Sequence, residues 1–334
     1  MGVSKSDTKR IVGLDVVKII AMLSVVASHS LNVLRAEGIG PGMTQIIHSL
    51  TVGGVPLFFM VSGYLLLRRK NIAYKYALRK IFHIIRYMAC ACILYWVALA
   101  IAHRDISLIR NCLSDFAGTF TLNGTFSLFW FLWAMALIYA LLPVIHLLYK
   151  SYAKVFNAGV CVLGVIVLSN FLISINLHRE IGVAAPPPLK LWNWLFFFML
   201  GTILNRYPMK GVKWGYVIPL FILANVAQRH FIEPILGCYT NLSFAGSPIS
   251  IALFISIFCW AVNHRWKDTA FIKVSGNYFM PVYTLHPIVI GLLSGVGISL
   301  PCPYVLWPAI VAISAIAISR IILRIPHADR AFKL

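Results

Sequence analysis

The sequence predicts an all-α polytopic membrane protein with about ten transmembrane helices and both termini in the cytoplasm. Of its 334 residues, 60% are hydrophobic and 11% are charged, whereas about a quarter of the residues in soluble proteins are charged. The mean hydropathy is +0.85. The apolar residues also gather in stretches of about 20, the length that a helix needs to cross a bilayer. These observations exclude a water-soluble protein.

Ten apolar ranges are predicted to be spans. In chain order they are 12–33, 46–67, 81–102, 126–149, 155–176, 187–205, 214–232, 247–263, 276–298 and 303–324. In the second range, Gly53-Gly54 and Pro56 predict a kink that opens a cavity. The ninth and tenth ranges are separated by Pro301-Cys302-Pro303, where proline ends a helix. The longest connection is too short for a soluble domain, so residues 1–334 are expected to form a single transmembrane domain with no appended soluble domain.

The distribution of basic residues sets the orientation. With the N-terminus inside, 19 of the 29 basic residues fall in cytoplasmic segments, as the positive-inside rule requires. Six are assigned to outer segments: Arg35, Arg104, Arg110, Arg179, Lys190 and Arg229. Topology therefore explains the net charge of +20, and no nucleic-acid partner is expected. The basic stretch 69–80 is predicted to lie along the inner membrane interface.

Motifs for cofactors and metals are absent from the sequence. No zinc spacing, phosphate-binding loop, dinucleotide fingerprint or haem ligand set occurs, so neither a metal nor a permanently bound cofactor is expected. The seven cysteines follow no metal spacing. A disulfide among Cys112, Cys238 and Cys302, which fall in predicted outer loops, stays open.

The first range carries three ionisable residues, Asp15, Lys18 and His29, and such groups inside hydrocarbon mark candidate functional sites. Eleven residues turn a helix about 20° beyond three full turns, so Lys18 and His29 share one face, about 16 Å apart along the axis. Asp15 borders this face and can pair with Lys18. A neutral imidazole suits general-base work, and a buried cation suits an anionic ligand group. Alternatively, Asp15 and Lys18 reach the inner interface and His29 makes a structural hydrogen bond.

Four motifs follow one another along nearly the whole chain. The first is a basic residue and a histidine separated by ten residues, Lys18 and His29. The second is Phe-Phe-x-x-Ser-Gly at 58–63, and the third is Trp-Phe-Leu at 130–132, followed by Tyr139 and Pro143. The fourth is Tyr-x-x-His-Pro at 283–287. This series resembles the acyltransferase-3 family of integral-membrane acyltransferases. The family's basic position is most often Arg, and Lys lacks the bidentate fork of Arg.

The resemblance implies a multi-pass O-acetyltransferase of the bacterial inner (cytoplasmic) membrane. It would move an acetyl group from cytoplasmic acetyl-CoA to a hydroxyl of an envelope glycan, such as lipopolysaccharide O-antigen or a related lipid-linked saccharide. His29 and Lys18 would be catalytic, with His29 either a general base or a covalent acyl carrier. Lys18, with Arg79 and Arg86, would bind the donor phosphates. The expected partners are acetyl-CoA, the saccharide acceptor and membrane lipids.

Three further residues, Ser62, Trp130 and His286, are substrate-binding candidates. Each has a structural alternative. Ser62, next to Gly63, favours close helix packing, and Trp130 suits a membrane interface. His286 can bond a carbonyl that the following proline leaves without its helical donor. Likewise, Arg86 can reach the membrane surface rather than the donor.

Two other function classes remain open. A transporter or exporter of a small anionic or acylated metabolite also needs buried cations, although the sequence shows no inverted repeat of the kind such transporters use. A scaffold subunit has no reason to bury both Lys18 and His29. The pair His264 and Asp268 matches a motif of some soluble acyltransferases, but it lies in a short basic loop without their fold and is discounted.

Overall fold

The computed structural model describes residues 10–36, 38, 40–182, 185–209, 211–236, 244–295, 303–322 and 324. Within these residues all regular secondary structure is helical. The α-helices are α1 (Val12–Ala36), α2 (Pro41–Thr51), α3 (Gly54–Leu67), α4 (Tyr74–His103), α5 (Asn111–Thr121), α6 (Trp130–Ser151), α7 (Ala153–Asn176), α8 (Leu191–Arg206), α9 (Trp214–Leu236), α11 (Pro248–Asn263), α12 (Ala270–Asn277), α13 (Phe279–Gly295) and α14 (Pro303–Ile322). Short 3-10 turns are η1 (Ile106–Arg110), η2 (Ser127–Phe129) and η3 (Pro187–Leu189).

Every predicted span overlaps at least one of these helices. Five helical stretches are long and apolar enough to cross a membrane, judged by length and composition: Val12–Leu31, Gly42–Leu67, Tyr74–Ile101, Ser127–Ser151 and Ala153–Asn176. Three shorter apolar helices are Pro248–Asn263, Phe279–Leu293 and Val305–Ile321. The chain is thus an all-helical protein with membrane-spanning character, and the count of ten spans and the cytoplasmic termini stay predictions.

The predicted kink in the second span is a break between α2 and α3 at Val52 and Gly53. Gly54 begins α3 directly against α1. A Cβ atom built on Gly54 would lie 2.8 Å from Cγ2 of Val25 and 3.2 Å from the carbonyl oxygen of Ala21. Because Ala21 and Val25 lie between Lys18 and His29, this close approach fixes α3 against the candidate site's own helix.

The centre of the bundle is the crossing of α3 and α8. A Cβ atom on Gly63 would lie 1.7 Å from the carbonyl oxygen of Phe198, and one on Gly201 would lie 2.1 Å from that of Met60. No side chain fits at such distances, so two glycines allow the backbones to touch, as small residues do in membrane helix pairs. The close packing that the Ser62-Gly63 pair predicts is therefore present at Gly63.

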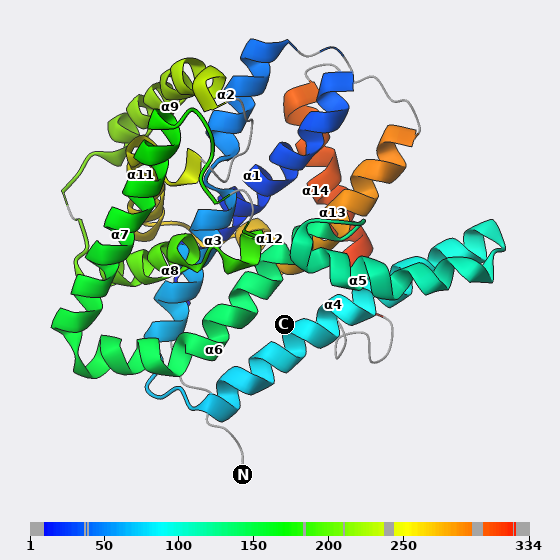
Figure 1. Ribbon diagram of the computed structural model, residues 1–334, viewed down its shortest axis with the longest axis horizontal. Helices are drawn as coiled ribbons and strands as arrows, with labels where there is room; N and C mark the ends of the chain where they lie inside the picture. The colour runs from blue at the N-terminus through cyan, green and yellow to red at the C-terminus, as the bar shows by residue number, and fades with distance from the viewer. Residues whose placement is uncertain are drawn as a thin grey trace.

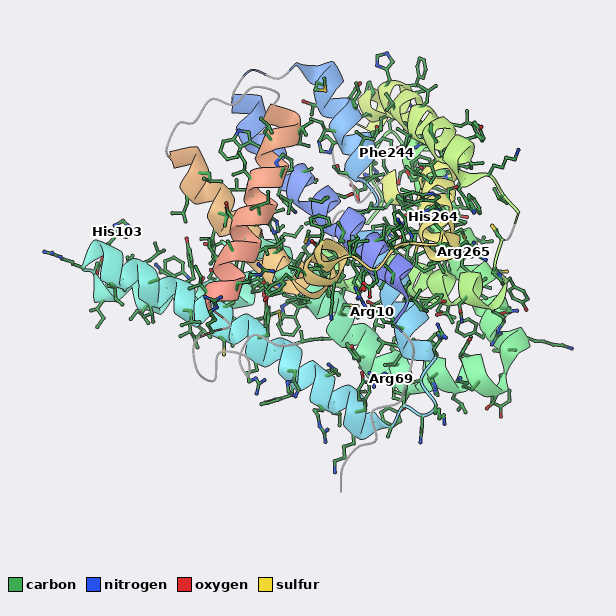
Figure 2. All side chains as sticks on the ribbon, turned by 180° about the vertical axis from the view of Figure 1, so that it is seen from behind. Arg10, Arg69, His103, Phe244, His264 and Arg265 are labelled. Carbon is green, nitrogen blue, oxygen red and sulfur yellow. The ribbon has the colours of Figure 1, made fainter. Side chains whose placement is uncertain are left out.

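The helices around the candidate site are α1, α13 and α14, which lie side by side in Figure 1. In the same view α4 runs obliquely, and its second half projects with α5 beyond the other helices (Figure 1). His103, labelled in Figure 2, lies at the far end of this arm. Helix α4 begins earlier than the predicted span: residues 74–80 of the basic stretch form its first turns and continue into it without a break.

Arg229, which the sequence assigns to an outer segment, lies inside α9 with no exposed surface, and its Nη1 is 3.7 Å from Oε1 of Glu233. The side of the membrane on which it lies stays a prediction. Lys190 is also buried and its Nζ donates to Glu180 at 3.2 Å. Both side chains are therefore held by carboxylates within the protein.

Of the three cysteines predicted to lie in outer loops, the structure describes one. Cys112 lies in α5 and forms no disulfide with another described cysteine; burial raises the pKa of its thiol, and Asp115 adds to the effect. Cys238 and Cys302 lie outside the described residues, as does most of the Pro301-Cys302-Pro303 connection.

Candidate active site

Helix α1 carries the predicted pair Lys18 and His29 on one continuous run of helix. The unbroken helix preserves the spacing on which the prediction depends, so the two side chains share a face. Both are partly buried, and the side chain of Lys18 is 18% exposed. Each end of this face has its own set of partners.

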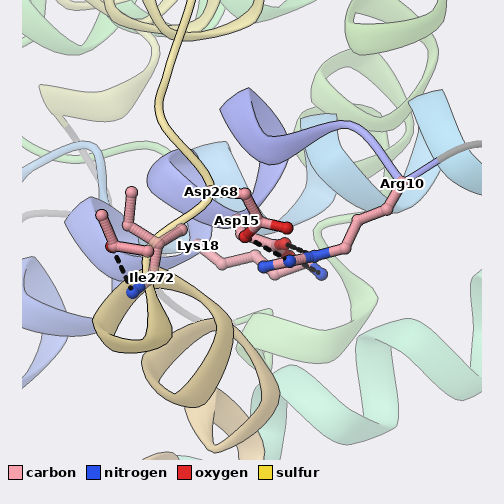
Figure 3. A network of polar contacts seen from close by, with 6 residues as sticks. Arg10, Asp15, Lys18, Asp268 and Ile272 are labelled. Atoms are coloured by element: carbon pink, nitrogen blue, oxygen red, sulfur yellow. Dashed lines mark hydrogen bonds and ion pairs between the residues drawn. The ribbon is translucent and has the colours of Figure 1, made fainter.

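At the Lys18 end, Asp15 accepts hydrogen bonds from two cations. Nζ of Lys18 is 3.0 Å from Oδ1 of Asp15, and Nε of Arg10 is 2.7 Å from its Oδ2. Nη1 of Arg10 also lies 2.6 Å from Oδ1 of Asp268 (Figure 3). The predicted pairing of Asp15 with Lys18 is therefore present, and Arg10 extends it into a network of two cations and two carboxylates.

The network ties the start of α1 to the segment between α11 and α12. Arg10 and Asp268 are 258 residues apart in the chain, and Figure 2 places Arg10 near the segment that carries His264 and Arg265. Desolvation lowers the pKa of Arg10, but its bonds to Asp15 and Asp268 outweigh that effect and raise it overall. The His264 ring packs against Trp266 at 4.6 Å between centroids, so Asp268 and His264 have separate partners and the discounted motif forms no unit.

At the other end, His29 meets His286 of α13. The two ring centroids are 5.3 Å apart, with the planes inclined by 37°. His286 has no exposed surface. Its Nδ1 lies 3.1 Å from the carbonyl oxygen of Val282, while its buried Nε2 has no hydrogen-bond partner among the residues that the structure describes. Because a carbonyl only accepts, Nδ1 carries the proton, and Nε2 of the neutral ring holds a lone pair.

Helix α13 is anchored on both sides of this contact. The hydroxyl of Tyr283 donates to the carbonyl of Leu128 in η2, and the hydroxyls of Thr284 and Tyr87 bond to each other, which joins α13 to α4. Further toward the start of α13, Phe279 lies under Nζ of Lys18, 5.7 Å from its ring centroid. Thus α13 follows α1 from the cationic end to the imidazole end.

The other predicted donor-binding residues stand on a different helix. Arg79 is exposed near the start of α4, and Arg86 is partly buried and donates from Nη2 to Nδ1 of His83 at 3.1 Å. Helix α4 packs chiefly on α6, η1 and α5. Their role in donor binding remains a prediction.

Ser62 is partly buried in α3, and Trp130 is buried in α6. The Ser62 hydroxyl donates to the carbonyl of Phe58 at 2.8 Å, one turn back in α3. Trp130 is buried against Trp194, 5.0 Å between ring centroids, and Trp194 in turn stacks on Phe59. Trp130 therefore faces protein rather than a membrane surface, and its indole packs between α6 and α8.

Sequence reasoning missed two features of this region. The contact between His29 and His286 depends on how α1 and α13 pack, which no local pattern indicates. The buried pair of Arg229 and Glu233 had a visible signal, because a cation and a carboxylate four residues apart share a helix face. Among the described residues, no group of three or more His, Cys, Asp or Glu side chains could hold a metal ion.

Comparison with known proteins decides the family. The acyltransferase-3 model, described as an acyltransferase domain, matches residues 11–324. The chain belongs to the acyltransferase-3 family. Its apolar helices and this family together indicate a membrane acyltransferase, which requires an acyl donor and an acceptor.

One curated relative of this acyltransferase-3 protein is named amino-acid racemase and comes from Enterococcus faecalis. The two are 24% identical over 313 residues, which is 86% of this chain and 42% of the relative. The chain therefore spans less than half the length of that relative. No solved structure gives a significant match.

Proposed function

We propose that this protein is an O-acetyltransferase that moves an acetyl group from cytoplasmic acetyl-CoA to a hydroxyl of an envelope glycan, such as O-antigen or a related lipid-linked saccharide. The observation that supports this proposal is the single face of α1, with a cation at one end and a partly exposed imidazole, His29, at the other. The proposed setting is a bacterial inner membrane, where the donor is available on the cytoplasmic side.

The reaction requires a base that takes the proton from the acceptor hydroxyl and passes it to the leaving thiolate. His29 takes the proton from the acceptor hydroxyl while the hydroxyl oxygen attacks the thioester carbon. The C–S bond then breaks, and the thiolate sulfur takes the proton from His29. An alternative order, in which His29 first carries the acetyl group itself, uses the same residue and gives the same products.

Lys18 is proposed to bind a phosphate group of the donor. Its present partner is Asp15, which also accepts from Arg10. A donor phosphate can therefore take Lys18 while Asp15 keeps Arg10, so no carboxylate is left without a cation. The separation of about 16 Å along the helix places the phosphate end of an extended donor well away from its thioester.

The test compares His29→Ala with His230→Ala in cells that lack the native protein. His230 is an exposed histidine of α9 outside the proposed site, so it controls for loss of a histidine. Acetyl groups on surface glycans are measured by mass spectrometry and NMR, with membrane abundance measured in parallel. We expect no glycan acetylation with His29→Ala and normal acetylation with His230→Ala. Full acetylation by an abundant His29→Ala protein would contradict the proposal.

Transport of a small anionic or acylated metabolite is the second candidate. The observation that favours it is the pair of Arg229 and Glu233 inside α9, because buried charges within membrane helices often mark transport paths. Vesicles that contain the protein are given labelled acetyl-CoA without an acceptor. Uptake of the label, sensitive to Arg229→Gln, would support transport; no uptake, with transfer once an acceptor is added, would support the acyltransferase.

A further inference from the structure

The contact between His29 and His286 contains an asymmetry in exposure. His29 is partly exposed, whereas His286 has no exposed surface and its ring contacts that of His29. A molecule that approaches α1 can therefore touch His29, while His286 offers it no surface. Any chemical role of His286 is therefore exerted through His29.

The hydrogen bonds of His286 leave one of its two ring nitrogens available as an acceptor. Its Nδ1 donates to Val282, and the remaining nitrogen, Nε2, is buried with a lone pair and finds no partner in the described part of the chain. An unpaired buried acceptor is costly. The ring of His29 lies 5.3 Å from that of His286 between centroids, closer than the ring of Tyr283 at 6.0 Å. Two imidazoles joined edge to edge, with a ring radius of about 1.2 Å and a hydrogen bond of about 2.9 Å, have centroids about 5.3 Å apart. The observed separation is 5.3 Å, so the spacing of the two rings allows such a bond when the His29 ring is rotated to point an N–H at Nε2.

The backbone around His286 holds this nitrogen in place. Tyr283 and Thr284 connect α13 to η2 and to α4 through side-chain hydrogen bonds. Because α13 is joined to these two neighbouring elements, the position of Nε2 is set before any substrate binds. Bases in enzymes are commonly oriented by a third group of this kind.

We propose that His286 is a positioning residue: its Nε2 accepts a hydrogen bond from a ring N–H of His29, so that the other nitrogen of His29 presents its lone pair to the acceptor. This inference rests on the proposed acyl transfer for its biological meaning. When the acceptor O–H bond breaks and an N–H bond forms on His29, the new positive charge is shared with His286. The charge disappears when the proton leaves His29 for the thiolate.

The experiment uses diethyl pyrocarbonate, which acylates the free nitrogen of a histidine, on the purified full-length protein. The rate of modification of His29 is followed by mass spectrometry in four proteins: wild type, His286→Phe, His286→Gln and His146→Phe. Phenylalanine keeps a ring but removes the acceptor, and the glutamine side chain retains an acceptor oxygen. His146 is the matched control, since it is also buried and its Nε2 donates to a carbonyl, that of Arg69, at 2.9 Å.

We expect His286→Phe to slow the modification of His29 about tenfold, the scale of a hydrogen bond to a charged group. His286→Gln should recover most of the rate, and His146→Phe should match the wild type. In acyl-transfer assays, His286→Phe should lower kcat and leave KM for the donor unchanged. A purely structural role predicts equal losses for Phe and Gln, or no change in His29 reactivity, and either result overturns the proposal.

The chemical probe needs neither donor nor acceptor. If His29 reactivity depends on His286 while glycans are never acetylated, the positioning role stands and the proposed function fails. If acetylation depends on His29 while its reactivity ignores His286, the proposed function stands and this inference fails.

Discussion

At the start of α1, Lys18 belongs to a network of four charged side chains, whereas eleven residues later His29 faces a single imidazole, His286. The first end is partly exposed and its cations and carboxylates are balanced. At the second end His29 is also partly exposed, but its partner is fully buried. The comparison shows how one helix can separate two tasks: an exchangeable ionic network suits a charged ligand, and a buried pair of rings suits proton transfer.

The largest effect is expected from Asp15, the common partner of both cations. Asp15→Asn removes the charge that holds Arg10 and Lys18, and leaving cations without a carboxylate in a partly buried site should destabilise the protein by about 2 kcal/mol. Thermal unfolding in detergent micelles measures this. Asp105→Asn is the control, because Asp105 is exposed and caps η1 only locally. Equal midpoints for the two variants would show that Asp15 does not hold the network.

A smaller effect is expected from Lys18 and appears in donor use. Lys18→Ala should raise KM for acetyl-CoA about tenfold, the effect of losing one charge-assisted hydrogen bond, while Lys18→Arg should stay near the wild type. Steady-state kinetics with purified protein measure both. Equal losses in Ala and Arg variants would argue against a simple charge role and for a requirement of the lysine shape.

Arg10 should have the smallest effect. Its side chain is 34% exposed, and exposed ion pairs contribute up to about 1 kcal/mol. Arg10→Gln should therefore lower the unfolding midpoint slightly, and the difference from wild type should shrink in high salt because salt screens exposed charges. If Arg10→Gln lowered the unfolding midpoint as much as Asp15→Asn, the contact of Arg10 with Asp268 would contribute more to stability than the contact between Lys18 and Asp15.

The sequence predicts the local parts of this site and misses its long-range parts. The eleven-residue spacing and the nearness of Asp15 to Lys18 are properties of one helix, so both could be derived from periodicity. Arg10 meets Asp268, and His29 meets His286, only because distant helices pack together, and a single sequence contains no direct signal for such contacts.

The fold divides in the same way. Glycine and proline at 53–56 predict the break between α2 and α3 because they act on their own backbone. The touching of Gly63 and Gly201 with their partner helices requires both helices at once. A charge near the end of an apolar range predicts that Arg229 lies at a boundary, whereas α9 continues past it to Leu236 and Arg229 pairs with Glu233 inside the helix.

The most direct test of the division of tasks along α1 is the equilibrium binding of CoA to two variants, measured by calorimetry on purified protein. We predict that His29→Ala binds CoA as tightly as the wild type, although it transfers no acetyl group, and that Lys18→Ala binds about tenfold more weakly. Loss of CoA binding in His29→Ala, with unchanged binding in Lys18→Ala, would contradict the account.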